Sequence, residues 1–229
     1  MTGDFRVCVL KCPTLSDSFA AQMLTISCFT GGIAQTNGYL VDTPQGRFAV
    51  DAPEGFAGWL DEQGVRVEVL LLTHQHFDHV QDAAMIQETH GARVVAFAPF
   101  SRDLTLEAMF GFATGRSVLV PEFTVNERAL GGDSVDVLGM TWRAEHIPGH
   151  STDSIVFINE AEKLVFSGDV LFESSIGRCD FPGGDKRMLL KGIALKLLPL
   201  PDDTVLFPGH GGSTTIGREK ADNPYLDEA

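Results

Sequence analysis

The sequence predicts one α/β domain built from mixed β-sheets, and three observations support this class. The chain has 229 residues, of which 44% are hydrophobic, so it can bury a large core. Some apolar runs are separated by segments with a helical pattern, which predicts crossovers between parallel strands. Other runs are separated by a few turn residues such as Gly131, Gly132 and Asp133, which predicts antiparallel hairpins. Both kinds of connection in one chain favour sheets of mixed direction.

The segment 1–23 is expected to be a loose arm or a short helix that need not belong to the core. It holds turn-forming residues such as Pro13, Ser16 and Asp17. The domain itself is therefore expected to span 24–229. The apolar run Val7–Leu10 is far shorter than the core of a signal peptide, so no signal peptide is expected.

Strands are expected where short apolar runs are bounded by turn residues. Asn37–Val41 and Phe48–Asp51 flank a Pro/Gly turn and predict a hairpin. Val69–Leu72 is continuously apolar, as in a strand that is covered on both faces. The other predicted strands are Leu24–Phe29, Arg93–Phe97, Thr124–Leu130, Ser134–Leu138, Met140–His146, Ile155–Asn159, Lys163–Ser167 and Thr204–Phe207.

Helices are predicted from capping residues and from a hydrophobic period near 3.6. Asp185 is expected to cap a helix whose Leu189, Ile193 and Leu197 form one apolar stripe. Glycine after a helical pattern predicts the end of the helix. The predicted helices lie between Pro53 and Gly64, from after His79 to about His90, over Ser101–Phe112, and from Asp185 to about Leu198.

The charge of the chain excludes several function classes. There are 17 Lys and Arg against 31 Asp and Glu, which gives a formal net charge of −14. This excess of carboxylates disfavours binding to nucleic acid and to anionic membranes. No apolar stretch is long enough to span a membrane. A cytoplasmic protein with free thiols is expected, and its oligomeric state is left open.

A dense set of metal-ligand side chains directly follows a predicted buried strand. In Thr73–His79, three imidazoles and one carboxylate fall within six residues. Imidazole and carboxylate are preferred ligands of zinc and neighbouring ions. His74 and His76 can hold one ion, because side chains two residues apart in an extended loop can point the same way. Asp78 and His79 lie further round the turn and are expected to serve a second ion.

Three further ligand candidates follow later predicted strands. They are His150, Asp169 and His210, and each has a neighbouring glycine that allows a tight turn and a close approach to a buried ion. An α/β sheet gathers its ligands at the carboxyl ends of its strands, so these residues are expected to meet the first group. The two remaining histidines, His90 and His146, are expected to be structural.

The ordered motifs resemble those of a known superfamily. His-x-His-x-Asp-His at 74–79, Pro-Gly-His-Ser at 148–151, Ser-Gly-Asp at 167–169 and Pro-Gly-His-Gly at 208–211 resemble the metallo-β-lactamase superfamily. The segments 168–185 and 215–225 are similar to its glyoxalase II branch, and they are closest to the short, single-domain members. The resemblance implies a four-layer αββα sandwich, in which two mixed sheets lie face to face with helices outside.

The resemblance also implies a site for two divalent metal ions. Zinc is the first expectation, with iron or manganese as alternatives. The implied ligands are His74, His76 and His150 for the first ion, Asp78, His79 and His210 for the second, and Asp169 as a bridge between them.

The implied activity is hydrolysis of a small-molecule thioester such as S-lactoylglutathione by a hydroxide that bridges the metals, with Asp78 and Asp169 as the catalytic carboxylates. A thiolate leaves with little acid assistance, because the reference pKa of a thiol is about 8.5. Two alternatives stay open. One is a persulfide dioxygenase with a single iron on His74, His150 and Asp169, and the other is a lactonase.

Several positions depart from the glyoxalase II pattern or carry a secondary role. Only 19 residues follow His210, so the helical domain that contacts glutathione in full-length members is expected to be absent. Asp51 is expected to act in a turn or to orient a ligand. Cys179 is expected to pack. Arg178 is a candidate for binding a substrate carboxylate, with an ion pair to Asp180 or Asp185 as the alternative.

Overall fold

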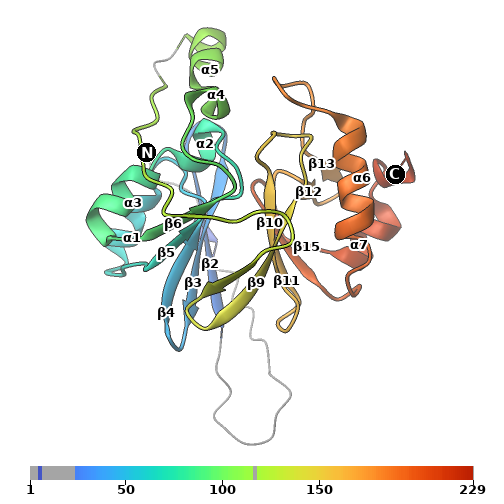
Figure 1. The fold of residues 1–229 in the computed structure, drawn as a ribbon, viewed down its shortest axis with the longest axis horizontal. Helices are drawn as coiled ribbons and strands as arrows, with labels where there is room; N and C mark the ends of the chain where they lie inside the picture. The colour runs from blue at the N-terminus through green and yellow to red at the C-terminus, as the bar shows by residue number, and fades with distance from the viewer. Residues whose placement is uncertain (1–4, 7–23, 116–117, 229) are drawn as a thin grey trace, which may run out of the picture.

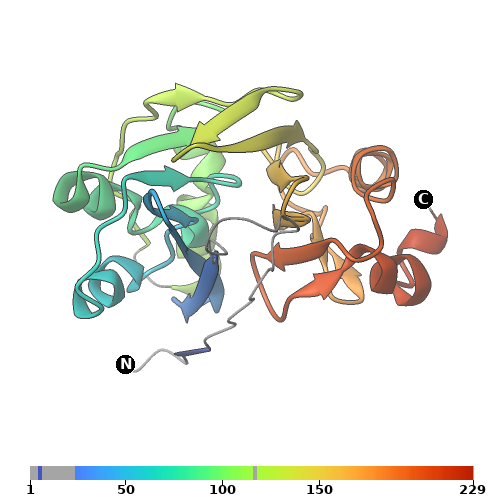
Figure 2. The ribbon, with the colours of Figure 1, turned by 90° about the horizontal axis from the view of Figure 1, so that it is seen from below.

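The computed structural model describes residues 5–6, 24–115 and 118–228, and it shows a four-layer αββα sandwich (Figures 1 and 2). Two mixed sheets lie face to face, and helices cover the outer face of each. This confirms the predicted fold class. The remainder of the predicted arm 1–23 lies outside the described residues.

The first sheet changes from antiparallel to parallel pairing along its width. Strands β1 to β4 pair antiparallel, and β4 to β7 pair parallel. Its strands, in spatial order, are β1 (Phe5–Arg6), β2 (Thr25–Gly31), β3 (Thr36–Thr43), β4 (Gly46–Val50), β5 (Val69–Leu71), β6 (Arg93–Ala96) and β7 (Glu127–Arg128).

The second sheet is mainly antiparallel, with one parallel pair between β11 and β14. Its strands, in spatial order, are β15 (Thr214–Thr215), β14 (Val205–Pro208), β11 (Leu164–Gly168), β10 (Ile155–Asn159), β9 (Met140–His146) and β8 (Ser134–Val137). A separate small hairpin joins β12 (Leu171–Phe172) to β13 (Ser175–Ile176).

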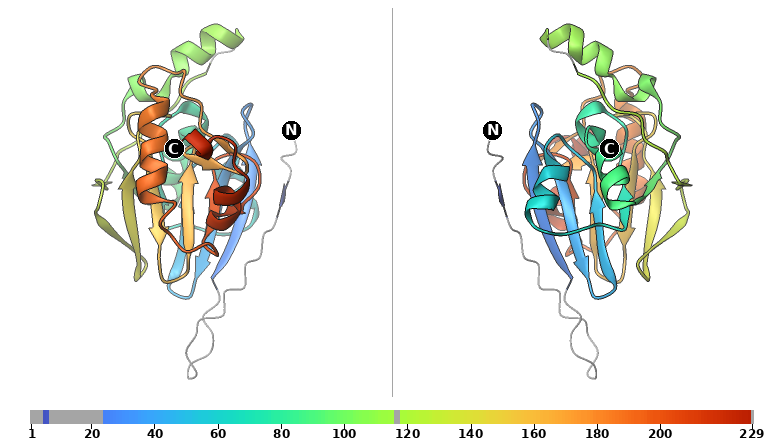
Figure 3. Two further views of the ribbon diagram at one scale, coloured as in Figure 1. Left: turned by 90° about the vertical axis from the view of Figure 1, so that its right-hand side faces the viewer. Right: turned by 90° about the vertical axis from the view of Figure 1, so that its left-hand side faces the viewer.

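The helices cover the two outer faces, as the two side views of Figure 3 show. Helices α1 (Phe56–Glu62) and α3 (Ala83–His90) cover the first sheet, and α6 (Lys186–Lys196) and α7 (Ile216–Asp222) cover the second. At one end of the sandwich lie α2 (Phe77–Val80), α4 (Arg102–Thr105) and α5 (Glu107–Thr114) (Figure 1).

Three apolar layers follow from the alternation of side chains along each strand. In β10, Ile155 and Phe157 enter the layer between the sheets, while Val156 and Ile158 face the helices of the second sheet. The layer between the sheets also contains large aromatic rings, among which Trp142 is completely buried. The continuously apolar strands of the sequence are therefore covered on both faces, as predicted.

Three predicted boundaries are wrong, and the backbone shows why. Helix α1 begins at Phe56 rather than Pro53, because the Pro53 carbonyl accepts a hydrogen bond from Phe56 N and closes a turn before the helix. The predicted helix Ser101–Phe112 is two helices, broken at Leu106, which has a positive φ of 53°. The predicted strand Thr124–Leu130 shortens to β7.

Elements that were not predicted also occur. Helix α7 and the hairpin of β12 and β13 have no counterpart in the sequence interpretation, and Phe5–Arg6 pairs with β2 as an edge strand. None of the helices in the described parts of the chain has the length and apolarity needed to cross a lipid bilayer.

The cap of α6 gives a test of the local structure. The Asp185 side chain accepts a hydrogen bond from Met188 N at 2.9 Å. We expect Asp185→Ala to lower the free energy of unfolding by about 1 kcal/mol, because it leaves a helix N–H group without this acceptor. Asp185→Asn should retain most of the stability, because asparagine caps almost equally well. Urea denaturation of both variants measures this, and equal losses would contradict the capping role.

Candidate metal centre

All seven predicted ligand residues meet at the carboxyl ends of the strands. His74 and His76 follow β5, Asp78 and His79 lie in α2, His150 follows β9, Asp169 follows β11, and His210 follows β14. The side chains belong to both sheets, so the site depends on how the two edges are joined.

Backbone hydrogen bonds join the two sheets beside the site. Ile155 N donates to Thr73 O at 2.8 Å, and Asn37 N donates to Gly209 O at 2.8 Å. Within the second sheet, Gly209 N donates to Gly168 O at 2.9 Å. These bonds fix the loops that carry the ligands without using the ligand side chains.

Glycines beside the ligands allow the close approach that the sequence predicted. A Cβ atom at Gly209 would collide with Asp169 Oδ1 and with His79 Cε1. Gly168 has a positive φ of 49°, and a Cβ atom there would collide with the Thr73 hydroxyl. A side chain at Gly209 would therefore displace two ligands, and one at Gly168 would displace Thr73, which precedes the ligand His74.

The ligand atoms form three overlapping groups, and within each group all atoms lie within 4.8 Å of one another. Each group has the composition and spacing of a metal site. The groups are His74, His76 and His150; His74, His79 and Asp169; and Asp78, His79 and His210.

Asp169 lies between the two outer groups, which are the first and the third of these. One of its oxygens is 3.4 Å from His150 Nε2 and 3.3 Å from His210 Nε2, and the other is 3.4 Å from His79 Nε2. The carboxylate thus faces a histidine of the first predicted set and two histidines of the second. This position is compatible with the bridging role that the resemblance implies.

Several buried ligand atoms have no hydrogen-bond partner in the protein. They are His74 Nε2, His79 Nε2 and Asp169 Oδ1. Buried polar atoms are normally satisfied, so a group of them aimed at one point indicates a site for a cation. Imidazole and carboxylate are suitable donors for a divalent metal, and the residues present therefore fit such an ion.

Hydrogen bonds on the outer side of the imidazoles orient the rings. The Nδ1 atoms of His79, His150 and His210 lie 2.8 Å from Asp51 Oδ2, 2.8 Å from Arg178 O and 3.3 Å from Gln35 O, respectively. These oxygens can only accept, so each Nδ1 carries the proton and leaves Nε2 free to coordinate a metal. His76 differs, because its Nδ1 lies 2.9 Å from His150 Nε2 and faces the cluster.

Asp51 orients His79, as predicted for a residue that supports a ligand. It is only 1% exposed, and its carboxylate also accepts hydrogen bonds from the Thr73 backbone and hydroxyl, at 2.8 Å each. On the other side of the site, Thr36 donates to Asp78 at 2.6 Å. Thr36 and Thr73 were not identified from the sequence, since no local motif marks their contacts.

Burial lowers the pKa of the three histidines in the first ligand group. It is the largest cause for His74, His76 and His150, and neighbouring imidazoles lower the pKa further. These side chains are therefore neutral near pH 7 and ready to act as ligands.

Carboxylates have the opposite effect on the pKa of His79 and His210. Burial by itself would lower the pKa of His79 and His210, but the charges of Asp169 and Asp78 outweigh it and raise both pKa values. Burial would raise the pKa of Asp169, yet His79 and His210 hold it well below its usual range. A metal that binds here must replace protons held by the imidazoles.

Arg178 and Cys179 lie close in sequence to Asp169, but neither side chain joins the cluster in the described structure. Arg178 makes two hydrogen bonds with Asp180, at 2.9 and 2.7 Å, and is exposed. The alternative of an ion pair with Asp180 is thus the arrangement observed. Burial raises the pKa of the Cys179 thiol, which contacts the Gly177 carbonyl at 3.3 Å.

His90 and His146 lie outside the three ligand groups. His90 Nδ1 accepts a hydrogen bond from Val67 N, at 3.3 Å. His146 stacks on Phe97 with ring centroids 4.0 Å apart, and its Nε2 contacts the Thr152 carbonyl at 2.8 Å. Both therefore have structural partners of their own.

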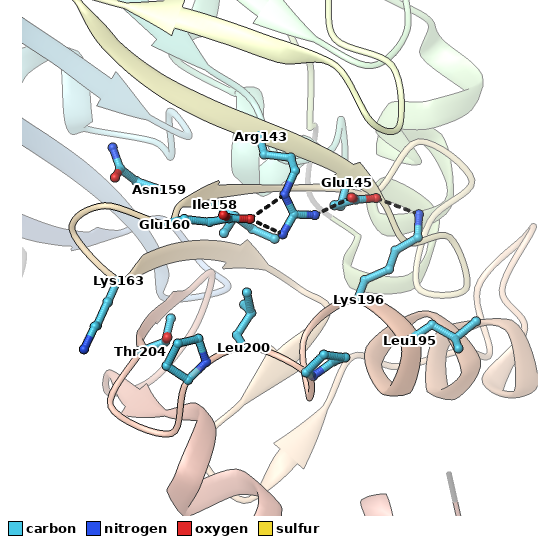
Figure 4. Close-up of a pocket in the computed structure, with 12 residues that line it drawn as sticks. Arg143, Glu145, Ile158, Asn159, Glu160, Lys163, Leu195, Lys196, Leu200 and Thr204 are labelled. Atoms are coloured by element: carbon cyan, nitrogen blue, oxygen red, sulfur yellow. Dashed lines mark hydrogen bonds and ion pairs between the residues drawn. The ribbon is translucent and has the colours of Figure 1, made fainter.

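A separate pocket of about 480 Å³ lies against β9, β10 and the end of α6 (Figure 4). None of its lining residues belongs to the ligand cluster. Four of its charged side chains pair with one another: Arg143 lies 2.9 Å from Glu160, and Lys196 lies 3.0 Å from Glu145. This pairing braces α6 against the sheet, and we assign the pocket no ligand.

Comparisons with known proteins agree with this architecture. A family model described as the Metallo-beta-lactamase superfamily matches residues 32–210, a region that contains the whole cluster. The chain is 36% identical over 172 residues to the hydroxyacylglutathione hydrolase GloC of Haemophilus influenzae, with 73% of this chain and 80% of the relative covered.

Two crystal structures are also similar to this chain. The BLEG-1 B3 metallo-beta-lactamase is 31% identical with a TM-score of 0.77, and the match covers 88% of this chain and 99% of that chain. TTHA1623 in a di-iron-bound form is 35% identical with a TM-score of 0.73, and the match covers 86% and 98%, respectively. The ordered motifs, the αββα architecture and these matches agree: the chain belongs to the metallo-β-lactamase superfamily.

Proposed function

We propose that the protein is a metal-dependent hydrolase of thioesters, with S-lactoylglutathione as the first substrate to assay. The position of Asp169 between the two outer ligand groups carries this proposal, because it suits a site with two metals. The likeness to a hydroxyacylglutathione hydrolase supports the choice of substrate.

The proposed ligand sets are those that the resemblance to the superfamily implies. His74, His76 and His150 would hold the first ion, Asp78, His79 and His210 would hold the second, and Asp169 would serve both. Zinc remains the first choice of metal, while a di-iron form of a similar protein makes iron a direct alternative.

Divalent ions at this site would lower the pKa of a water molecule and polarise the carbonyl of the substrate. The protein's part is to hold the ligands in place and to exclude bulk water. His79 is completely buried and Asp169 is only 8% exposed, so charges at the cluster interact in a medium of low polarity. The Asp51 carboxylate keeps the proton of His79 on Nδ1, away from the cluster.

A thioester suits this site because its leaving group needs little help. A thiol has a pKa of about 8.5, so the thiolate departs near neutral pH without a strong acid. A general acid beside the cluster is therefore not required. Arg178 can bind a substrate carboxylate only by exchanging its partner Asp180.

The bridging assignment gives a prediction about metal content. We expect Asp169→Ala to lose both ions, because one carboxylate serves both, whereas His210→Ala should weaken only the second. Elemental analysis after extensive dialysis measures the number of ions per chain. An Asp169→Ala protein that kept both ions would contradict the assignment.

His90→Gln and His146→Gln are matched controls for this experiment. Both remove an imidazole that is outside the cluster, so the metal content should equal that of the wild type and activity should fall by less than about tenfold. Loss of metal from either variant would show that the division of the histidines is wrong.

The two predicted sites should differ in their dependence on pH. His79 and His210 have raised pKa values, so they take up protons at a higher pH than the other three ligand histidines, and the second ion must displace those protons. His74, His76 and His150 have lowered pKa values and are already neutral. Affinity for the second ion should therefore fall more steeply as the pH drops from 8 towards 6.

Calorimetric titration of the metal-free protein in buffers of different ionisation enthalpy counts the protons released by each ion. More protons should accompany the second ion than the first. Equal release at both steps would contradict the charge distribution described above.

The activity itself is tested with purified, metal-loaded protein. We expect hydrolysis of S-lactoylglutathione with a high KM, because Arg178 and Arg218 are already paired with Asp180 and Glu173 and would have to leave these partners to bind the glutathione carboxylates. An oxygen-electrode trace with glutathione persulfide is run in parallel. Oxygen consumption without thioester cleavage would overturn the proposal in favour of the iron-dependent dioxygenase.

A further inference from the structure

Two aromatic side chains stand beside the ligand cluster. The Phe181 ring lies edge-on to His76 and His150, with centroids 5.4 and 5.7 Å away. Phe110 of α5 lies against Phe181, with ring centroids 5.7 Å apart. Both phenylalanines are only partly buried, and Phe181 is the one that contacts the ligands directly. We refer to Phe110 and Phe181 as the aromatic wall.

Neighbouring side chains hold the aromatic wall in place. Phe77 directly follows the ligand His76, is buried, and packs on Phe110 with ring centroids 4.6 Å apart. The Arg178 guanidinium lies over the Phe181 ring, 4.5 Å from its centroid. A surface that is fixed by packing loses little entropy when a ligand binds to it, which favours recognition by apolar contact.

The cations Arg178, Arg218 and Lys220 are all paired with acids. Arg178 pairs with Asp180, Arg218 pairs with Glu173 at 2.8 Å, and Lys220 with Asp202 at 2.6 Å. A substrate carboxylate would have to displace an acid from its partner. The formal net charge of −14 also disfavours the approach of an anion.

The location of the aromatic wall determines which part of a substrate it can contact. A carbonyl that reacts at the cluster must come close to the ligands, and the Phe181 ring touches two of them. The carbons attached to that carbonyl are therefore within reach of the ring. An apolar acyl chain would cover the exposed aromatic surface, whereas a hydroxylated two-carbon chain would leave much of it in water.

We propose that the aromatic wall selects thioesters with an apolar acyl chain, and that the carboxylates of the thiol half add little to recognition. This inference rests on the thioester hydrolysis proposed above. Phe181 is the specificity-determining residue, and Phe110 supports it.

The test measures kcat/KM for acetyl, butanoyl and hexanoyl thioesters of N-acetylcysteamine, which carries no carboxylate. With the wild type, kcat/KM should rise by at least about tenfold from acetyl to hexanoyl, as for added methylenes in an apolar pocket. Phe181→Ala should remove most of this rise, and Phe181→Leu should keep part of it. Metal content and thermal unfolding establish that both variants are folded and loaded.

Phe112→Ala is the matched control. Phe112 lies on the same helix as Phe110, but it is 94% exposed, and its removal should leave the acyl-chain dependence unchanged. A flat dependence in the wild type, or an unchanged dependence in Phe181→Ala, would overturn the inference. A preference of more than about tenfold for hexanoylglutathione over hexanoyl-N-acetylcysteamine would do the same, since it would show recognition of carboxylates.

A binding measurement separates this inference from the proposed function. S-hexyl and S-methyl cysteamine thioethers cannot be hydrolysed, and calorimetry gives their affinities for the metal-loaded protein. Tighter binding of the hexyl compound that is lost in Phe181→Ala supports the aromatic wall even if no thioester is cleaved. Equal affinities overturn the inference even if S-lactoylglutathione is hydrolysed.

Discussion

His79 is completely buried between two carboxylates, and the geometry of the candidate site depends on this arrangement. Its Nδ1 is 2.8 Å from Asp51, and its Nε2 is 3.4 Å from Asp169. Buried anions are stable only when hydrogen bonds or positive charge compensate them. Thr73 and His79 compensate Asp51, whereas Asp169 depends on the imidazoles gathered around it. A divalent cation would supply the same compensation more strongly, which is why this cluster fits a metal.

The αββα architecture supplies these groups because the carboxyl ends of strands from both sheets reach the same edge. The ligands need no long reach, since each follows directly after a strand or lies in the adjoining short helix. This arrangement requires unusual backbone conformations, since Asp51 itself has a positive φ of 57°. It also requires glycine at positions 168 and 209, where any side chain would collide with the site. The same edge carries the aromatic wall, so metal ligands and the proposed acyl contact share one rigid support.

The sequence predicted the site better than some of its surroundings, and the reason is physical. The ligands lie in short motifs after apolar runs, so local pattern was enough to identify His74 or His150. The pair of Asp51 with His79 joins residues 28 positions apart, and that of Thr36 with Asp78 spans 42 positions, so no local pattern reveals either contact. Helix breaks such as Leu106 depend on a single backbone conformation that composition does not encode. The position of Phe181 against two histidines likewise follows from tertiary packing.

The proposed two-metal site requires that one carboxylate, that of Asp169, is shared by both ions. Anomalous X-ray scattering from crystals of the metal-loaded protein, collected at the absorption edge of the bound metal, tests it most directly. We expect two peaks, one beside His74, His76 and His150 and the other beside Asp78, His79 and His210, with an oxygen of Asp169 coordinating each. A single fully occupied peak under saturating metal, or two peaks of which only one contacts Asp169, would contradict it.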